Sequence, residues 1–150
     1  MRNIFIASIL ALSALGLGGC AKNYADNFVG TYDVTVKASV GGIPIPDQTT
    51  TATIELDGDE GDVKCTIVGV TVEGTASSLG LALDPVTYSS TSNIMGSDIQ
   101  FEVTFENGEI IPPLNEAGKT SWTSAMKGFY TTPNNTTQID ETVIFMATKK

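Results

Sequence analysis

The sequence of 150 residues contains no histidine. Ser-His-Asp and Cys-His catalysis use an imidazole as the general base, and His-ligated zinc sites depend on the same ring. The lack of histidine therefore excludes these sites and any other imidazole acid–base chemistry, whatever the fold.

Basic residues are also scarce. Eight Lys and Arg stand against 17 Asp and Glu, which gives a formal net charge of −9. Nucleic acids and anionic membrane surfaces both attract proteins through clusters of Lys and Arg. We therefore expect no nucleic-acid partner and no electrostatic attachment to a membrane.

Only two cysteines are present, Cys20 and Cys65. Two cysteines in an oxidising compartment often form a disulfide, so the state of Cys65 depends on what happens to Cys20. Cys65 alternates with polar neighbours in the stretch 63–67. This pattern is typical of a small buried hydrophobic residue rather than of a reactive thiol.

The apolar run near the N-terminus is too short to cross a membrane. It covers residues 4–17 and follows Arg2, whereas a spanning helix needs roughly 20 apolar residues. A basic start, a short apolar run and small residues after it are typical of a secretory signal. The string Leu17-Gly18-Gly19-Cys20 resembles the lipobox of bacterial lipoproteins. That resemblance implies cleavage before Cys20, a diacylglycerol thioether on its sulfur and an acylated amino terminus. An ordinary signal peptide is the alternative.

The lipobox resemblance divides the chain into a signal peptide (1–19), a lipidated tether (20–27) and one folded domain (28–150). Residue 21 is Ala, not the Asp that often retains bacterial lipoproteins in the inner membrane. The resemblance therefore implies attachment to the outer membrane, on its periplasmic or its surface face. Lipid on Cys20 would leave Cys65 without a disulfide partner. Several acyl chains, at ~0.8 kcal/mol per buried CH₂, hold such a domain firmly.

Apolar and polar residues alternate through several segments of the domain. Tyr32, Val34 and Val36 fall on one face of a first strand, and the run 99–105 alternates in the same way. Such alternation is typical of antiparallel strands with one wet face. Turn signals separate the runs, and no segment has a convincing helical period. We predict an all-β fold with a single antiparallel barrel of about eight strands; a β-sandwich is the alternative.

Three local predictions accompany this fold. Residues 63–72 form one strand whose apolar face switches near Gly69, which indicates a bulge or bend. The Ser-rich run 89–93 forms a loop. Asn107-Gly108 forms a tight turn.

The start of the domain resembles that of the lipocalin-like (calycin) lipoproteins of Gram-negative bacteria. Phe28-Val29-Gly30-Thr31-Tyr32 corresponds to the lipocalin Gly-x-Trp motif, with Tyr32 in the aromatic place. The resemblance implies a meandering barrel, open at one end, that often holds a small apolar ligand. In that picture Ile43 and Ile45 lie on a loop at the open end, where they cover the mouth or contact a partner. Local packing of the loop is the alternative.

Five large side chains on the later strands are candidates for the wall of a ligand cavity, with a plain core role as the alternative: Phe101, Phe105, Trp122, Met126 and Tyr130.

Acidic residues suggest two other kinds of site. The string 57–62 offers carboxylate oxygens for calcium, but it lacks the EF-hand spacing and is interpreted as a solvated hairpin tip. Glu102 and Glu141 are candidates for a glycosidase pair, but Glu102 lies on the polar face of its strand. We therefore expect no enzyme, no metal site and no cofactor.

The function predicted from the sequence is a lipoprotein held at the membrane by Cys20 that binds a small apolar ligand without catalysis. The alternative is a structural or protein-interaction module of an outer-membrane assembly, with a filled barrel. No protein partner can be named.

Overall fold

The computed structural model describes residues 23–58 and 61–150. The signal segment, the lipobox and Cys20 lie outside these residues. The described elements are a 3-10 helix η1 (Tyr24–Asn27) and the strands β1 (Gly30–Lys37), β2 (Ser39–Val40), β3 (Ile43–Pro44), β4 (Gln48–Leu56), β5 (Asp62–Ile67), β6 (Val70–Ser77), β7 (Gly80–Leu83), β8 (Val86–Ile94), β9 (Ser97–Glu106), β10 (Lys119–Thr132) and β11 (Asn135–Lys149).

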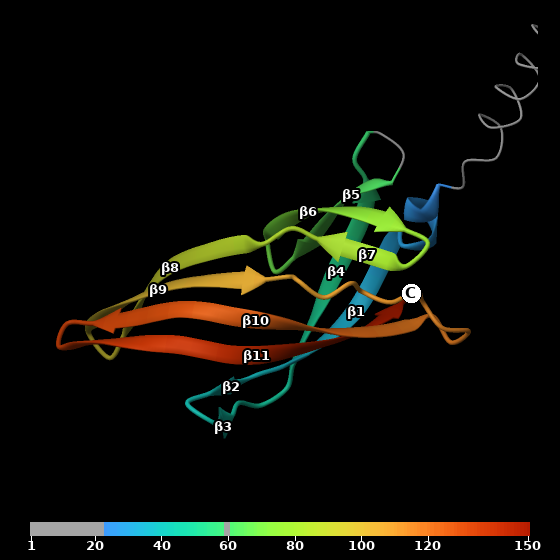
Figure 1. Cartoon of the computed structure of the whole chain (residues 1–150). Helices are drawn as coiled ribbons and strands as arrows, with labels where there is room; N and C mark the ends of the chain where they lie inside the picture. Colours follow the sequence, from blue (N-terminus) through green and yellow to red (C-terminus); the bar gives the residue numbers. More distant parts are fainter. Residues whose placement is uncertain (1–22, 59–60) are drawn as a thin grey trace, which may run out of the picture.

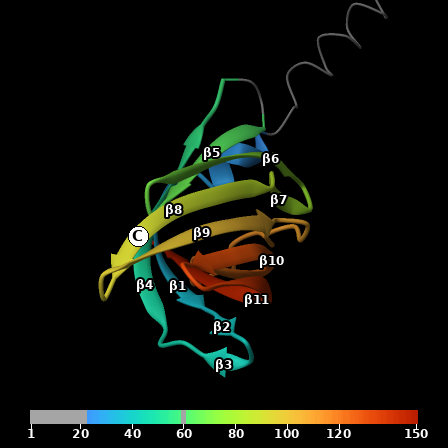
Figure 2. The ribbon, with the colours of Figure 1, turned by 90° about the vertical axis from the view of Figure 1, so that its left-hand side faces the viewer.

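Nine of these strands form one antiparallel sheet in the order β7-β6-β5-β4-β1-β11-β10-β9-β8, and β2 and β3 form a separate hairpin. The sheet curls so that its two ends approach each other, which makes a half-barrel (Figure 1 and Figure 2). The predicted all-β, barrel-like class is therefore confirmed. The sheet has nine strands where about eight were expected, and it is one curled sheet rather than a sandwich.

The two ends of the sheet are linked near their meeting point. β7 and β8 stand at opposite ends of the strand order, yet only two residues, Asp84 and Pro85, separate them along the chain. The free edge of β7 is bridged at Leu81 to Ile111, in the connection between β9 and β10, by two backbone hydrogen bonds of 2.9 and 2.8 Å. This bridge covers the side of the barrel that β7 alone leaves open.

The core follows the alternation of the sequence. Tyr32 and Val34 on β1 and Ala52 and Ile54 on β4 point inward and are buried, while the residues between them are more exposed. The Tyr32 hydroxyl donates a 2.5 Å hydrogen bond to the Phe28 carbonyl. The aromatic residue of the Gly-Thr-Tyr string thus packs inside the barrel at its start.

The prediction of one bulged strand over 63–72 is wrong. β5 and β6 are two strands of a hairpin that pair from Asp62↔Thr75 to Ile67↔Val70, with Val68 and Gly69 as the turn. Both turn residues have positive φ, +50° and +76°. A two-residue turn of this kind reverses the chain and still returns alternate residues to the same face. The change of apolar phase near Gly69 therefore came from a reversal rather than from a bulge.

Two further local predictions are also wrong. Residues 89–93 belong to β8 rather than to a loop, because they pair with β9 along their whole length. Hydroxyl side chains suit an exposed strand when they bond across it, as Thr87 and Thr104 do at 2.8 Å. Asn107 opens a long connection instead of a tight turn, and its amide donates to the Asp84 carbonyl at 2.8 Å.

The last four strands reach beyond the barrel. β10 and β11 pair over 14 positions, and 14 residues of strand span roughly 45 Å. β1 pairs with β11 only as far as Ile144. Residues 89–103 of β8 and β9 and residues 128–139 of β10 and β11, which pair with one another, make a four-stranded extension that projects from the barrel (Figure 1).

Candidate functional site

A cavity of about 310 Å³ lies on the inner side of the curled sheet. Its lining comes from both halves of the barrel, so it exists only because the sheet curls. The lining residues are Val36, Ala52, Cys65, Ile67, Val68, Val70, Val72, Leu83, Val86, Tyr88, Phe105, Asn107, Trp122 and Phe145.

Two kinds of side chain form the wall. The first half of the sheet supplies small and β-branched residues at the inward positions of β1, β4, β5 and β6. The later strands supply an aromatic cluster in which Trp122 stacks on Phe145, with ring centroids 4.9 Å apart and planes 11° apart. Phe105 meets Phe145 edge-on at 6.5 Å. Small residues opposite large rings leave the space that the cavity occupies.

The opposite end of the barrel interior is filled. Phe28, Tyr32, Leu81 and Ile111 are buried there beside η1 and leave a void of about 20 Å³. Trp122 contributes to the walls of both spaces. The barrel is therefore packed solid at the η1 end and hollow at the other.

The rim of the cavity lies where β1 ends and where β5 turns into β6. Val36 is the last inward residue of β1, and Val68 in the turn is 74% exposed. The β2–β3 hairpin follows β1 directly, so Ile43 and Ile45 lie at this end. Both side chains are exposed, at 71% and 40%, and neither belongs to the cavity lining.

The cavity wall carries no formal charge. Its polar side-chain groups are the Asn107 amide, the Tyr88 hydroxyl, the Trp122 indole nitrogen and the Cys65 thiol. Burial raises the pKa of Cys65 to about 11, so the thiol is protonated at neutral pH. Placing an ion here would cost several kcal/mol without an opposite charge to pair with it. The wall therefore favours neutral, apolar molecules.

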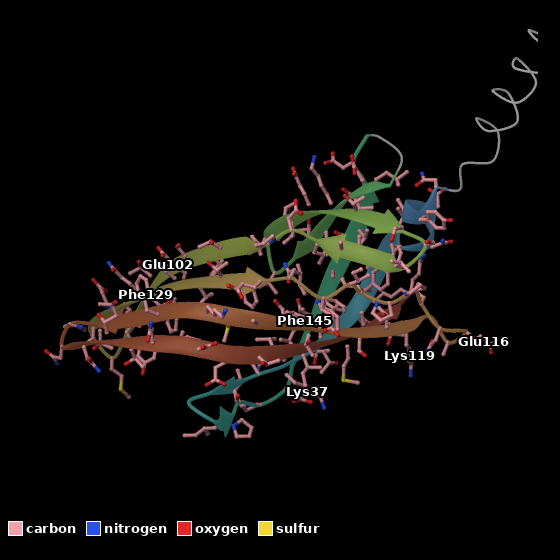
Figure 3. The ribbon with its side chains drawn as sticks, viewed as in Figure 1. Lys37, Glu102, Glu116, Lys119, Phe129 and Phe145 are labelled. Atoms are coloured by element: carbon pink, nitrogen blue, oxygen red, sulfur yellow. The ribbon has the colours of Figure 1, made fainter. Side chains whose placement is uncertain are left out.

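Two of the five predicted wall residues, Phe105 and Trp122, line the cavity. Phe101 and Tyr130 lie on the extension, where their ring centroids are 5.9 Å apart. Met126 is half-buried in β10 directly opposite Phe105, but it is not among the lining residues. Phe101 and Tyr130 are outside the lining because β9 and β10 continue well past the barrel. Figure 3 labels Glu102 and Phe129 on the extension, away from Phe145 at the barrel.

The remaining wall residues were missed by the sequence analysis. Most of them belong to the β5–β6 hairpin and to the start of β8. The sequence did contain a signal for them. Apolar, mostly β-branched residues alternate on both sides of Gly69, and if this segment is read as a hairpin they all fall on one wall of the barrel. The contribution of Asn107 had no comparable signal.

The acidic candidates do not converge on a site. Asp59 and Glu60 of the string 57–62 lie outside the described residues, and Asp57 pairs with Lys64 at 2.6 Å. Among residues 23–58 and 61–150 no group of three or more Cys, Asp or Glu side chains is placed to hold a metal ion.

The proposed carboxylate pair is also separated. Glu141 lies opposite Met126, which lies opposite Phe105, so Glu141 is on the inner face of the sheet. Glu102 comes between the inward residues Val103 and Phe101 in β9. Alternation places Glu102 and Glu141 on opposite faces of the sheet. Glu141 instead accepts hydrogen bonds from the Ser39 hydroxyl (3.0 Å) and the Gly41 amide (2.7 Å). It holds the β2–β3 hairpin against β11.

Comparison with protein-family models, with curated proteins and with solved structures gave no match. Within the described part of the chain, none of the helical residues forms a segment long and apolar enough to cross a membrane.

Proposed function

We propose that this protein binds one small apolar molecule, without chemical conversion, in the cavity of its half-barrel. The observation that carries the proposal is the 310 Å³ space lined almost entirely by apolar side chains. Ligand pockets of about 300–1,000 Å³ with such walls are the usual size for small-molecule sites. A barrel that served only as a scaffold would gain stability by filling this space, as the η1 end does.

The ligand we propose is uncharged. No Lys, Arg, Asp or Glu lines the cavity, so an ionic group would enter without a counter-charge. The chain as a whole is strongly acidic, which further disfavours an anion. Asn107 offers the carbonyl oxygen of its amide as an acceptor, while its amide nitrogen donates one hydrogen bond to the Asp84 carbonyl. One hydrogen-bond donor on an otherwise apolar ligand would match this wall.

We also propose that the domain is a lipoprotein of the outer membrane, anchored through Cys20. The support is the string Leu17-Gly18-Gly19-Cys20 after a short apolar segment. The sequence also resembles the lipocalin-like lipoproteins, whose all-β barrels often hold apolar ligands. That resemblance supports the proposed ligand binding as well as the lipid anchor. The alternative is a structural module whose cavity stays empty.

Two dyes of the same skeleton test the ligand class. N-phenyl-1-naphthylamine is neutral, and its sulfonated analogue, 8-anilinonaphthalene-1-sulfonate, is an anion. We expect the neutral dye to fluoresce on binding and to saturate at one molecule per chain. The anion should bind at least about tenfold more weakly, because the wall offers its charge no partner. Equal or stronger binding of the sulfonate would contradict a neutral ligand class.

A cavity-filling variant locates the site. Val70 points into the cavity and Thr71 beside it points outward. Val70→Phe should abolish saturable binding of the neutral dye, whereas Thr71→Phe should leave it unchanged. Native mass spectrometry of the purified chain then identifies any molecule that copurifies. If no neutral apolar molecule binds and Val70→Phe raises stability without any loss of binding, the scaffold alternative is correct.

A further inference from the structure

The sheet has several free edges, and three of them are protected. Exposed strand edges invite pairing with other chains, and proteins usually block them with short strands, charges, prolines or covering segments. β7 is only four residues long and is bridged to Ile111. The first part of β10, residues 119–124, does not pair with β9. Glu109 covers this edge by accepting hydrogen bonds from the Thr123 amide (2.7 Å) and hydroxyl.

The free part of β11 is protected in two ways. Beyond its pairing with β1 this strand carries Asp140 and Glu141. Glu141 also holds the β2–β3 hairpin beside it through Ser39 and Gly41. Charge and a covering segment therefore both guard this edge.

β8 has none of these protections. It ends the strand order, and within the described chain it pairs only with β9. Its nine residues, Val-Thr-Tyr-Ser-Ser-Thr-Ser-Asn-Ile, include no charged residue and no proline, and its pairing with β9 runs from Val86 to Ile94 without a bulge. Thr87, Ser89 and Thr91 are exposed on its outer face. This is a long, uncharged edge without a bulge.

We propose that the occupant of this edge is a second copy of the chain, joined through antiparallel β8–β8 pairing about a two-fold axis at Ser90. Two identical strands overlap over all nine residues only when Ser90 faces Ser90. That register places Ser89 opposite Thr91 of the other copy and keeps inward residues on one side. It joins the two sheets into one continuous sheet.

Charge and side-chain chemistry both favour a second copy. Each chain has a net charge of −9, so a segment that carries no charge is where two copies meet with the least repulsion. The chain already joins its own strands through opposed hydroxyl pairs, Thr66–Thr71 at 3.0 Å and Thr131–Thr136 at 3.2 Å. The Ser89–Thr91 pairs of the dimer would repeat the same contact.

Cysteine cross-linking tests the register. In the proposed dimer the two Ser90 Cα atoms face each other within about 4.5–5.5 Å, a separation that a disulfide can bridge. Two Ser92 residues would be offset by roughly 13 Å along the strand. Under mild oxidation the Ser90→Cys chain should become a covalent dimer, and Ser92→Cys, on the same strand and face, should not. Wild-type chain, with its buried Cys65, serves as the background.

Sedimentation of the purified full chain tests the dimer itself. The wild type should sediment as a dimer, and Ser89→Lys with Thr91→Lys should shift it to monomer, because lysines of the two copies then face each other. The neutral exchange Ser89→Thr with Thr91→Ser should remain dimeric. A wild type that is monomeric at every concentration, a dimer that survives the two lysines, or equal cross-linking of the two cysteine variants would overturn the proposal. A foreign strand as the occupant would give the first of these results.

Discussion

Val68 is a β-branched residue in a left-handed turn conformation, with φ at +50°, and its side chain is 74% exposed. This conformation costs a residue other than glycine roughly 1–2 kcal/mol, and a β-branched side chain makes it worse. Asn tolerates it. We therefore expect Val68→Asn to raise the free energy of unfolding by about 1 kcal/mol, measured by urea denaturation.

Met95 provides the matched control for this prediction. It has φ at +53° in the β8–β9 turn, is followed by Gly96 as Val68 is by Gly69, and is fully exposed. Because its side chain is unbranched, Met95→Asn should give a smaller gain than Val68→Asn. A loss of stability in Val68→Asn would show that the residue contributes more at the cavity rim than its backbone costs.

Cys65 should make the protein less stable in alkali. Burial raises the pKa of its thiol from 9.0 to about 11, so between these values the folded chain keeps a proton that the unfolded chain releases. The stability from the buried neutral thiol is full below pH 9 and is lost as pH rises through 11. The stability advantage of wild type over Cys65→Val should fall by on the order of 2 kcal/mol from about pH 8 to pH 11.

Urea denaturation of both chains at several pH values measures this difference. Burial also raises the pKa of Tyr32, to about 12, and the charge of Cys65 adds to this rise. The part due to burial is present in both chains and cancels, whereas the part due to Cys65 belongs to the effect of the thiol. A difference that stays constant with pH would mean that Cys65 titrates in the folded chain as it does in the unfolded one.

At the scale of the element, closure of the half-barrel depends on Gly80, at the start of β7. Its φ is +139°, and a Cβ at this position would overlap with the carbonyl oxygen of Ile111, the partner of Leu81 in the bridge. Gly80→Ala should therefore separate β7 from the β9–β10 connection and cost more than about 2 kcal/mol of unfolding free energy. Hydrogen exchange of the Leu81 and Ile111 amides should accelerate in parallel.

Gly108 is the matched control for Gly80. It lies in the same β9–β10 connection, and a Cβ there would meet no atom within 4 Å. Gly108→Ala should therefore leave both stability and amide exchange close to wild type. Protection of the Leu81 amide in Gly80→Ala would show that the bridge forms without Gly80 and that closure does not depend on this glycine.

Alternation predicted strands with one solvent-exposed face, because burial on the other face imposes a period of two on β1 and β9. It did not distinguish one strand from two around Gly69, since a two-residue turn leaves the inward positions on one wall. It also identified Phe101, Phe105 and Trp122 as inward residues without showing where the barrel ends. That limit is set by pairing between distant segments, such as the end of the β1–β11 ladder at Ile144.

At the scale of the whole molecule, the two ends of the barrel differ: the filled end carries η1, and the other end carries the rim of the cavity. The described chain begins at Asn23 and enters η1, which packs at the filled end near β6. The cavity rim and the turns of the extension lie at the opposite end (Figure 1). If Cys20 carries the lipid, only two residues separate the anchor from Asn23. The filled end then faces the membrane, and the cavity opens away from it.

Two exposed turn residues measure this orientation. Leu79, in the β6–β7 turn beside η1, is 72% exposed, and Met95 lies at the tip of the extension. With the lipidated chain in vesicles that carry a headgroup acceptor dye, a fluorophore at Leu79→Cys should transfer energy efficiently and one at Met95→Cys weakly. Cys20→Ala, made in both labelled chains, should leave the protein in the soluble fraction and remove both signals. Stronger transfer from position 95 would place the cavity against the membrane instead, and attachment that survives Cys20→Ala would mean that something other than the lipid holds the domain there.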